Sequence, residues 1–305
     1  MEAIVYEEFG GPEVLRHETG VAVPEPGAGE VRVKVAVVGV NPVDHKRRYG
    51  WVERFYPTTF PAVPGLEFAG TVDALGPGVT GVAVGDEVLG WTKTGAYAEY
   101  ALSELYVPKP AALSWEQAAS LPVAGETAAR VLALLGVKQG ETLLLHGAAG
   151  VVGSVAVQLA VAAGVTVIGT ASEPNHAYLR SLGAIPVTYG EGLATRVRAA
   201  APDGIDAVFD AAGHDTLPVS IELMAGEKAR IVTIAATDAE AHGIVFSGVM
   251  APPEEVRATL TTQTTQAAQG TLTIRVAETL PLKEAARAQA LSESGSPRGK
   301  LLLLP

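Results

Sequence analysis

Two hydrophobic patterns divide the chain. Up to about residue 120, segments such as 31–38 (VRVKVAVV) and 67–75 (EFAGTVDAL) show the alternation or the short apolar runs of buried strands. Gly and Pro interrupt this part every few residues, which predicts short strands in a barrel-like domain. A helix is expected to begin at Ser114, because Gln117 follows it at the spacing of a capping box.

From about residue 126 apolar strands alternate with helices. Strands are expected at 142–146, 165–170, 185–188, 205–210 and 230–235, and helices at 127–135, 151–163, 176–182, 193–200 and 216–223. This alternation is typical of βαβ units, whose right-handed crossovers build a doubly wound parallel sheet. The tail returns to the earlier pattern, with helices at 254–269 and 282–292 and strands at 271–277 and 300–304. We therefore expect one domain from 1–124 and 270–305, and a second, Rossmann-type domain at 125–269.

The composition excludes several functional classes. Of 305 residues, 48% are hydrophobic and 18% charged, which is incompatible with intrinsic disorder. The net charge of −11 without a basic run argues against nucleic-acid binding. There is no cysteine, so disulfides, thiol nucleophiles and cysteine-ligated zinc are excluded.

Neither a membrane span nor a signal peptide is expected. The segment 142–172 has no Asp, Glu, Lys or Arg and is long enough to cross a bilayer. Its regularly spaced glycines and His146 favour a buried strand, a tight turn, a helix and a second buried strand instead. The chain begins MEAIVYEEFGG, with acidic residues where a signal peptide has basic ones. A cytoplasmic location is the expectation.

A glycine-rich turn, GAAGVVG at 147–153, follows one of the apolar strands and opens a helix. Gly147 permits the tight turn, Gly150 lets backbone N–H groups approach phosphates, and Gly153 lets the helix pack on the strand. The helix N-terminus at Val151 and Val152 adds N–H donors and the helix dipole. These features predict binding of a dinucleotide pyrophosphate.

The end of the next strand distinguishes NADP from NAD. NAD enzymes usually have an acid at this position to bind the ribose hydroxyls. This chain has Ser172, whose hydroxyl can donate to a 2′-phosphate, and Asn175, His176 and Arg180 can line that phosphate. Glu173 comes one residue later, in the first turn of a helix, and is the feature that keeps NAD open. NADPH is the expected cofactor.

Several short stretches, taken in order, match one protein family. They are NPVD at 41–44, PGLEFAG at 64–70, GAYAE at 95–99, LPV at 121–123, HGAAGVVG at 146–153, LGA at 182–184 and GK at 299–300. Along nearly its whole length the chain resembles the zinc-free quinone oxidoreductases of the medium-chain dehydrogenase/reductase superfamily. The resemblance implies a GroES-like β-barrel-type catalytic domain, a Rossmann cofactor domain and a homodimer. The apolar segment 243–249 fits a dimer edge.

The zinc-dependent branch of that superfamily provides a comparison. Its zinc ligands include a cysteine at the position of Asn41 and a histidine at the position of Leu66, and a cysteine-rich lobe follows the position of Gly90. All of these are missing, so no metal is expected; His45 with Glu67 is only a makeshift alternative. Without zinc there is no Lewis acid to lower an alcohol's pKa. The expected reaction is hydride addition to a quinone or an α,β-unsaturated carbonyl.

The resemblance also implies site residues. Asn41 faces the nicotinamide and the substrate as a hydrogen-bond donor, or is a turn residue that bonds its own backbone. Thr127 lies beside the nicotinamide ring, or caps a helix. Tyr49, Trp51 and Tyr56 fall in the substrate-pocket segment, where they stack on a flat ring or simply pack a loop. Asn41, Thr127 and Tyr49 are the catalytic candidates, with solvent or a tyrosine as the proton donor.

Further contacts are expected at the carboxyl ends of the strands in the cofactor domain. The cofactor candidates there are Tyr189, Ala212, Ala235, Phe246 and Ser247. In the first domain Arg48 either binds an anion or, as we expect, pairs with Glu67, and Asp44 is expected to bond loop N–H groups.

Glu126 and Arg130 depart from the family's hydrophobic and aromatic pattern around Thr127. Together with the short aromatic segment 49–56, they leave open a dedicated biosynthetic tailoring reductase or cyclase on the same scaffold. A separate alternative is a non-catalytic NADPH-binding protein, as the lens crystallins of this family illustrate.

Overall fold

The chain passes from a first unit, Met1–Val123, into a second, Ala124–Ala251, and returns to the first with Pro252–Pro305. All 305 residues are described in the computed structural model. Both elements of the predicted fold class, a β-rich domain and a parallel-sheet Rossmann domain, are confirmed. Helix α2 (Trp115–Leu135) carries the chain across the boundary at residue 123.

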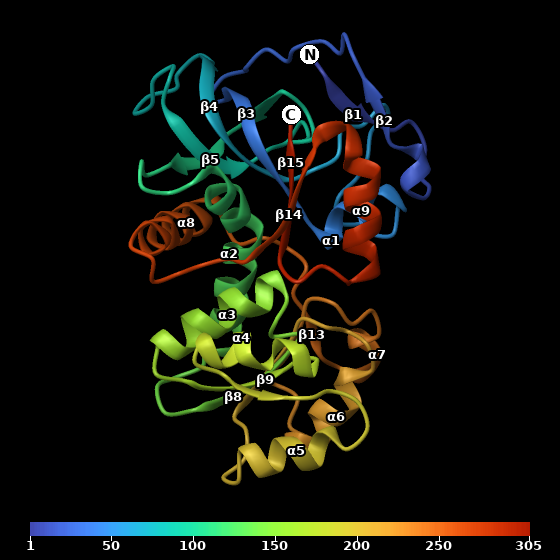
Figure 1. The fold of residues 1–305 in the computed structure, drawn as a ribbon, viewed down its shortest axis with the longest axis vertical. Helices are drawn as coiled ribbons and strands as arrows, with labels where there is room; N and C mark the ends of the chain where they lie inside the picture. Colours follow the sequence, from blue (N-terminus) through green and yellow to red (C-terminus); the bar gives the residue numbers. More distant parts are fainter. The chain divides into compact units, whose positions relative to one another are not determined.

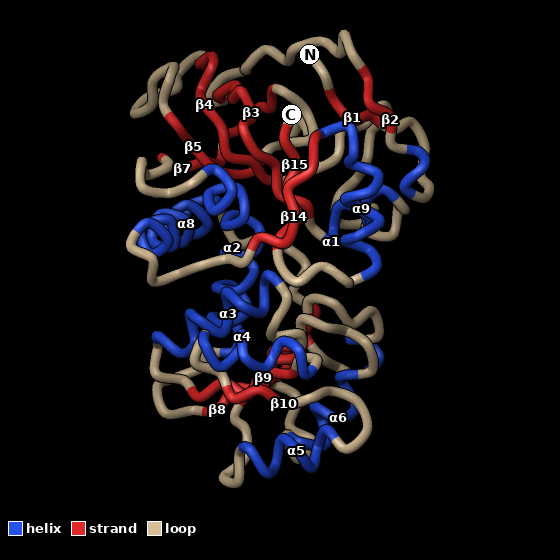
Figure 2. The backbone as a smooth tube through the Cα atoms, viewed as in Figure 1, coloured by secondary structure: helices blue, strands red, loops and turns tan.

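The first unit is built on a seven-stranded sheet in the order β14-β15-β3-β4-β5-β7, with β6 also paired to β3. Its strands are β3 (Val31–Val40), β4 (Glu67–Leu75), β5 (Glu87–Trp91), β6 (Tyr100–Ser103), β7 (Leu105–Pro108), β14 (Val276–Pro281) and β15 (Lys300–Leu304). The alternate valines of β3 (Val31, Val33 and Val35) enter its core with Phe68. A separate pair is formed by β1 (Ala3–Val5) and β2 (Arg16–Glu18). The strands of this unit are drawn in red in Figure 2.

The helical elements of this unit are α1 (Pro42–Arg48), α8 (Pro253–Ala268), α9 (Ala285–Ser294), η1 (Pro12–Val14) and η3 (Leu282–Glu284). The short α1 was not foreseen, because seven residues after a proline give no clear periodicity. Asp44 in its first turn accepts a hydrogen bond from the Asn41 N–H at 2.9 Å, as expected for a residue that bonds loop N–H groups.

Helix α2 begins after Ser114, whose Oγ accepts the N–H of Gln117 at 3.2 Å, so the predicted cap is confirmed. The helix runs unbroken through the position where a separate helix was expected to start. Pro122 lies inside it, and the N–H of Val123 donates to Glu67 Oε2 at 2.7 Å. By length and composition α2 is apolar enough to cross a membrane, but 61% of its apolar window is buried, and a core helix meets the same criterion.

The second unit contains a six-stranded sheet in the order β10-β9-β8-β11-β12-β13, with every recorded strand pair parallel. Its strands are β8 (Thr142–His146), β9 (Thr166–Thr170), β10 (Ile185–Val187), β11 (Ala207–Asp210), β12 (Ile231–Thr233) and β13 (Val245–Phe246). Its helices are α3 (Val151–Ala162), η2 (Glu173–Asn175), α4 (His176–Ser181), α5 (Leu193–Ala200), α6 (Thr216–Leu223) and α7 (Ala239–His242). Helices α3 and α4 cover one face of the sheet, and α5 and α6 cover the other (Figure 1).

The strand order reverses between β8 and β11, and in such sheets ligands bind beside the carboxyl ends of the strands at this point. The charge-free segment 142–172 contains β8, α3 and β9, as predicted. The strand expected over 243–249 is limited to Val245–Phe246. The strand expected over 271–277 is displaced towards the C-terminus, since β14 runs from Val276 to Pro281.

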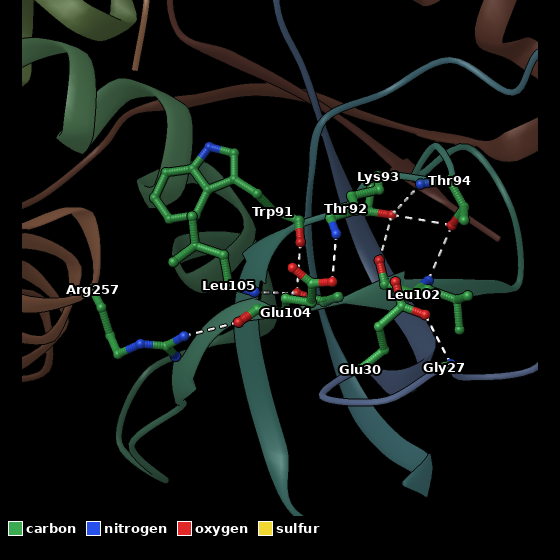
Figure 3. Close-up of polar contacts among 11 residues, drawn as sticks. Gly27, Glu30, Trp91, Thr92, Lys93, Thr94, Leu102, Glu104, Leu105 and Arg257 are labelled. Atoms are coloured by element: carbon green, nitrogen blue, oxygen red, sulfur yellow. Dashed lines mark hydrogen bonds and ion pairs between the residues drawn. The ribbon is translucent and has the colours of Figure 1, made fainter. Parts of the chain in front are cut away.

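The second domain boundary differs from the expected position. Helix α8 belongs to the first unit, so the boundary lies at 251/252 and not at 269/270. The guanidinium group of Arg257 on α8 donates to the backbone carbonyl of Glu104 at 2.8 Å (Figure 3). It also donates to the backbone carbonyl of Tyr106. Two prolines, Pro252 and Pro253, were the local sequence signal for this break.

Candidate functional site

The three glycines of the turn at 147–153 differ in their backbone conformation and in the space around them. Gly147 has φ of +71°, a left-handed conformation that favours glycine, and its N–H donates to Thr170 Oγ1 at 3.2 Å. A Cβ on Gly153 would lie 2.3 Å from the carbonyl oxygen of Gly147, so only glycine lets α3 pack this closely. Gly150 has φ of −69°, and its Cβ would meet only that same oxygen, at 3.2 Å. The packing requirement at Gly150 is therefore much weaker than at Gly153.

The N-terminus of α3 fits an anion. The helix begins at Val151 after Gly150, with no side-chain cap and no acidic residue in its first turn. The first N–H groups of such a helix, including those of Val151 and Val152, have no partner within the helix. A dinucleotide pyrophosphate matches this donor set and the helix dipole. The residues present therefore fit a dinucleotide cofactor.

A buried Asp–Thr pair shapes the neighbouring strand ends. The carboxylate of Asp210, at the end of β11, accepts the N–H groups of Ala212 and Gly213, both at 3.0 Å, and the hydroxyl of Thr233 at 2.6 Å. Thr233 Oγ1 in turn accepts the N–H of Ala235 at 3.0 Å. The turns that hold the predicted residues Ala212 and Ala235 thus share one anchor. The sequence signal that we missed was an aspartate closing a fully apolar strand.

The predicted 2′-phosphate residues do come together. Asn175 Nδ2 donates to Ser172 Oγ at 3.1 Å, and a ring nitrogen of His176 lies 3.3 Å from the carbonyl oxygen of Ala171. Glu173 is exposed in η2. Tyr189 follows β10 and is 59% exposed. The group around Ser172 is polar, and the predicted cation Arg180 is exposed in the last turn of α4.

Thr127 lies in the middle of α2, so its alternative role as a helix cap is wrong. Close by, Arg130 Nε donates to Glu126 Oε1 at 2.7 Å, and the same guanidinium donates to the hydroxyl and, at 3.1 Å, the carbonyl of Ser247. Glu126 Oε1 also accepts the N–H of Ala251 at 3.0 Å. The two residues that depart from the family pattern therefore tie the segment 247–251 to α2. Phe246, next to that segment in β13, is 41% exposed.

The first unit contains a buried polar cluster around Asn41. Asn41 Oδ1 accepts from Lys300 Nζ at 2.6 Å, and Asn41 Nδ2 donates to Glu67 Oε1 at 2.7 Å. Lys300 and Glu67 also form an ion pair, and both side chains are buried. A Cβ on Gly39 would lie 2.2 Å from Glu67 Oε1, so this glycine within β3 makes room for the carboxylate.

The expected ion pair between Arg48 and Glu67 is wrong. The fully buried Arg48 instead bonds Gln289 and, at 3.2 Å, Glu293 of α9. Lys300 takes its place beside Glu67, because the pairing of β15 with β3 brings the C-terminal strand to this end of the sheet.

The predicted pocket aromatics form a layered stack. The Tyr49 and Trp51 rings are 4.5 Å apart and within 9° of parallel, and the guanidinium carbon of Arg48 is 4.6 Å from the Tyr49 ring centre. Trp51 is the outer layer and is 64% exposed. Tyr56 is half-buried and lies outside this stack, with Arg47 5.8 Å from its ring centre.

Burial shifts the pKa values of two residues close to Asn41 in the chain, Asp44 and His45. It raises the pKa of Asp44 to about 6, against the opposing effect of hydrogen bonds from the Asn41 N–H and the Tyr97 hydroxyl. Both bonds go to Oδ2, at 2.9 and 3.0 Å, and Oδ1 has no partner. Burial lowers the pKa of His45 to about 4, so this histidine is neutral at pH 7.

The donor set does not fit a zinc ion. Leu66 carries no donor atom. Asn41 Oδ1 and Glu67 Oε1 are engaged with Lys300, and Glu67 Oε2 accepts the N–H of Val123. No group of three or more His, Cys, Asp or Glu side chains is placed to hold a metal ion.

The cysteine-rich lobe of the zinc branch is replaced by a tight turn after β5. Thr92 Oγ1 donates to the carbonyl of Leu102 at 2.8 Å and accepts the N–H of Thr94 at 3.0 Å (Figure 3).

Comparison with known proteins agrees with both halves of this description. Residues 27–110 match the family model "Alcohol dehydrogenase GroES-like domain", and residues 151–272 match "Zinc-binding dehydrogenase". The quinone oxidoreductase of Rattus norvegicus is 36% identical over 232 residues, which is 73% of this chain and 70% of that protein. The chain belongs to the quinone oxidoreductase branch of the medium-chain dehydrogenase/reductase superfamily.

Other members of the superfamily support this assignment. The chloroplastic NADPH-dependent alkenal/one oxidoreductase of Arabidopsis thaliana is 38% identical over 229 residues, covering 70% of this chain and 58% of that protein. The quinone oxidoreductase structure from Coxiella burnetii has a TM-score of 0.88 at 33% identity and covers 100% of this chain and 99% of its own. The Escherichia coli quinone oxidoreductase complexed with NADPH has a TM-score of 0.89 at 28% identity, with 100% of both chains covered.

Proposed function

We propose that the protein is an NADPH-dependent reductase that adds hydride to a quinone or an α,β-unsaturated carbonyl without a metal ion. The observation that carries the proposal is the engagement of Asn41 and Glu67 by the buried Lys300 ammonium. Alcohol oxidation in this superfamily needs a Lewis acid, which these positions do not supply. Quinones and enones are already electrophilic and need only positioning and charge stabilisation.

The second unit would hold the cofactor, and bound NADPH supplies the hydride. The turn at Gly147 and Gly150 and the first N–H groups of α3 bind the pyrophosphate. Ser172, Asn175 and His176 bind the 2′-phosphate. The remaining candidates contact the rest of the cofactor: Thr127, Gly153, Tyr189, Ala212, Ala235, Phe246 and Ser247.

The first unit would hold the substrate. As hydride reaches the substrate carbon, negative charge grows on the carbonyl oxygen, and a fixed donor stabilises that charge. Asn41 provides such a donor, since only one of its two amide hydrogens is used by Glu67. Trp51 and Tyr56 contact the flat substrate. A proton from solvent or Tyr49 then completes the reduction.

The first experiment is a fluorescence titration of the purified protein with NADPH and, separately, NADH. NADPH should bind more tightly, and a panel of quinones and enones should then consume it. Equal or tighter NADH binding would assign Glu173 to the ribose and overturn the cofactor preference. Tight NADPH binding without turnover on any substrate would support the non-catalytic alternative.

The Glu126–Arg130–Ser247 network favours a second candidate, a tailoring reductase for one dedicated metabolite. It replaces the family's apolar surroundings of Thr127 with an ion pair, which is a specific chemical change. Reduction of one natural enone but of no simple quinone would distinguish this candidate.

We also propose a cytoplasmic homodimer that pairs through β13. The edge segment exposes Val245 at 50%, Val249 at 67% and Phe246 at 41%, and an apolar edge strand is an aggregation risk unless covered. Size-exclusion chromatography with light scattering should give twice the chain mass of 31.4 kDa. Elution as a monomer would contradict the dimer.

A further inference from the structure

We propose that Lys300 is a positioning residue that fixes which end of the Asn41 amide faces the substrate. The inference rests on the proposed function, in which Asn41 donates to the substrate oxygen. It gives the C-terminal strand a part in the reaction.

Strand register brings the three groups of the cluster together. Leu301 of β15 pairs with Val40 of β3, and Gly39 of β3 pairs with Glu67 of β4. Lys300, Asn41 and Glu67 therefore lie side by side at one end of three adjacent strands. Their exposed fractions are 1%, 6% and 0%, so no bulk water competes for their hydrogen bonds.

The hydrogen bonds allow only one orientation of the amide. An ammonium group can only donate, and an ionised carboxylate can only accept. Asn41 Oδ1 must therefore face Lys300, and Nδ2 must face Glu67. A flipped amide would place its NH2 group against the ammonium and its oxygen against the carboxylate. One Nδ2 hydrogen remains as the donor that Asn41 offers to a ligand.

The orientation of the Asn41 amide determines whether the substrate meets the partial positive charge of an N–H group or the partial negative charge of a carbonyl oxygen. An N–H donor stabilises a developing oxyanion, whereas a carbonyl oxygen in the same place repels it. The ammonium also draws electron density towards Oδ1, which polarises the amide. Stability alone does not explain the buried pair, because apolar side chains of similar volume often serve equally well. Glu67 has its own fixed support, since its Oε2 accepts the N–H of Val123 at 2.7 Å.

The test compares K300M, K300R and the charge-neutral double variant K300M/E67Q. The double variant leaves no unpaired buried charge, so it should fold even where K300M does not. We expect kcat with a quinone to fall at least tenfold in K300M/E67Q, while the Kd for NADPH stays within twofold of wild type. K300R retains a cation and should recover part of the loss.

Lys109 provides a matched control. Its side chain is 5% exposed and lies just after β7, where it pairs at 2.8 Å with Glu87 of β5. K109M should leave kcat unchanged. If K300M/E67Q is folded and keeps the wild-type kcat while N41A loses activity, Lys300 does not position Asn41 and the proposal is overturned.

A second readout separates this proposal from the proposed function. The side-chain amide of Asn41 should give a pair of ¹⁵N–¹H resonances that shift strongly in K300M/E67Q and not in K109M. If the wild-type protein reduces no quinone or enone, the proposed function fails, and these resonances still report whether Lys300 fixes the amide. Asn41 resonances identical in wild type and double variant would overturn the positioning role by themselves.

Discussion

Alanine substitution at two glycines of the same turn should separate cofactor binding from folding. A methyl group at Gly153 would lie 2.3 Å from the Gly147 oxygen and 2.8 Å from the Cα of Ala148. Both neighbours are backbone atoms that cannot rotate away. A methyl group at Gly150 meets only the Gly147 oxygen, at 3.2 Å, in a backbone conformation that alanine adopts freely.

The magnitudes follow from these contacts. Ordinary contact begins near 3.4 Å, so G153A must move α3 or the turn by about 1 Å. Overpacking of this kind costs about 1–3 kcal/mol, and the displaced N–H groups should weaken NADPH binding as well. For G150A, the poorer helix cap and the lower entropy of the unfolded chain nearly cancel, leaving stability within about 1 kcal/mol of wild type. Its methyl group stands where the pyrophosphate is expected, so the Kd for NADPH should rise at least tenfold, about 1.4 kcal/mol.

Urea unfolding in the absence of cofactor and NADPH fluorescence titration give the two quantities independently. We expect G153A to lower both stability and affinity, and G150A to lower affinity alone. Wild-type NADPH affinity in G150A would refute the placement of the pyrophosphate. Wild-type stability in G153A would refute the argument that α3 needs glycine for close packing.

Two further predictions concern buried charge and cofactor choice. Burial lowers the pKa of His146 from 6.5 to about 4. As the pH falls, the unfolded chain therefore takes up a proton at this histidine before the folded chain does. The free energy of unfolding should then decrease as the pH falls from 6.5 towards 4. At about 1.4 kcal/mol per pH unit the loss reaches about 3 kcal/mol. Between pH 7.5 and 5, the free energy of unfolding should therefore decline less steeply in H146Q than in wild type. Equal slopes in the two proteins would contradict this. N175K adds an ammonium group beside Ser172. It should tighten NADPH binding about tenfold and leave NADH binding unchanged, because hydrogen bonds to charged groups are worth about 1.5–3 kcal/mol. An equal change for both nucleotides would show that residue 175 does not contact the 2′-phosphate.

Much of the second unit could be predicted from sequence because its signals are local. Apolar strands of β8 and β9, the turn at 147–153 and the helix that follows lie within about 30 consecutive residues. Periodicity and glycine spacing report directly on such segments. The cap at Ser114 was found for the same reason, since capping depends on residues three apart.

Weak local patterns account for the errors in element boundaries. The α2 helix continues through Pro122, because the N–H of Val123 finds a partner in the distant Glu67. Helix α8 was assigned to the other domain in the prediction, because its own pattern does not show that Arg257 binds the backbone carbonyls of Glu104 and Tyr106, more than 100 residues earlier.

The sequence by itself determined the fold class, the family resemblance and the glycine-rich turn at 147–153. Only the tertiary structure decided that Lys300, and not Arg48, pairs with Glu67, and that the Asn41 amide has one orientation. It also showed that Asp210 and Thr233 anchor the turns at Ala212 and Ala235. The physical reason is that charge partners are selected by strand register between segments far apart in the chain. Residue 300 and residue 41 become neighbours only when β15 adds to β3.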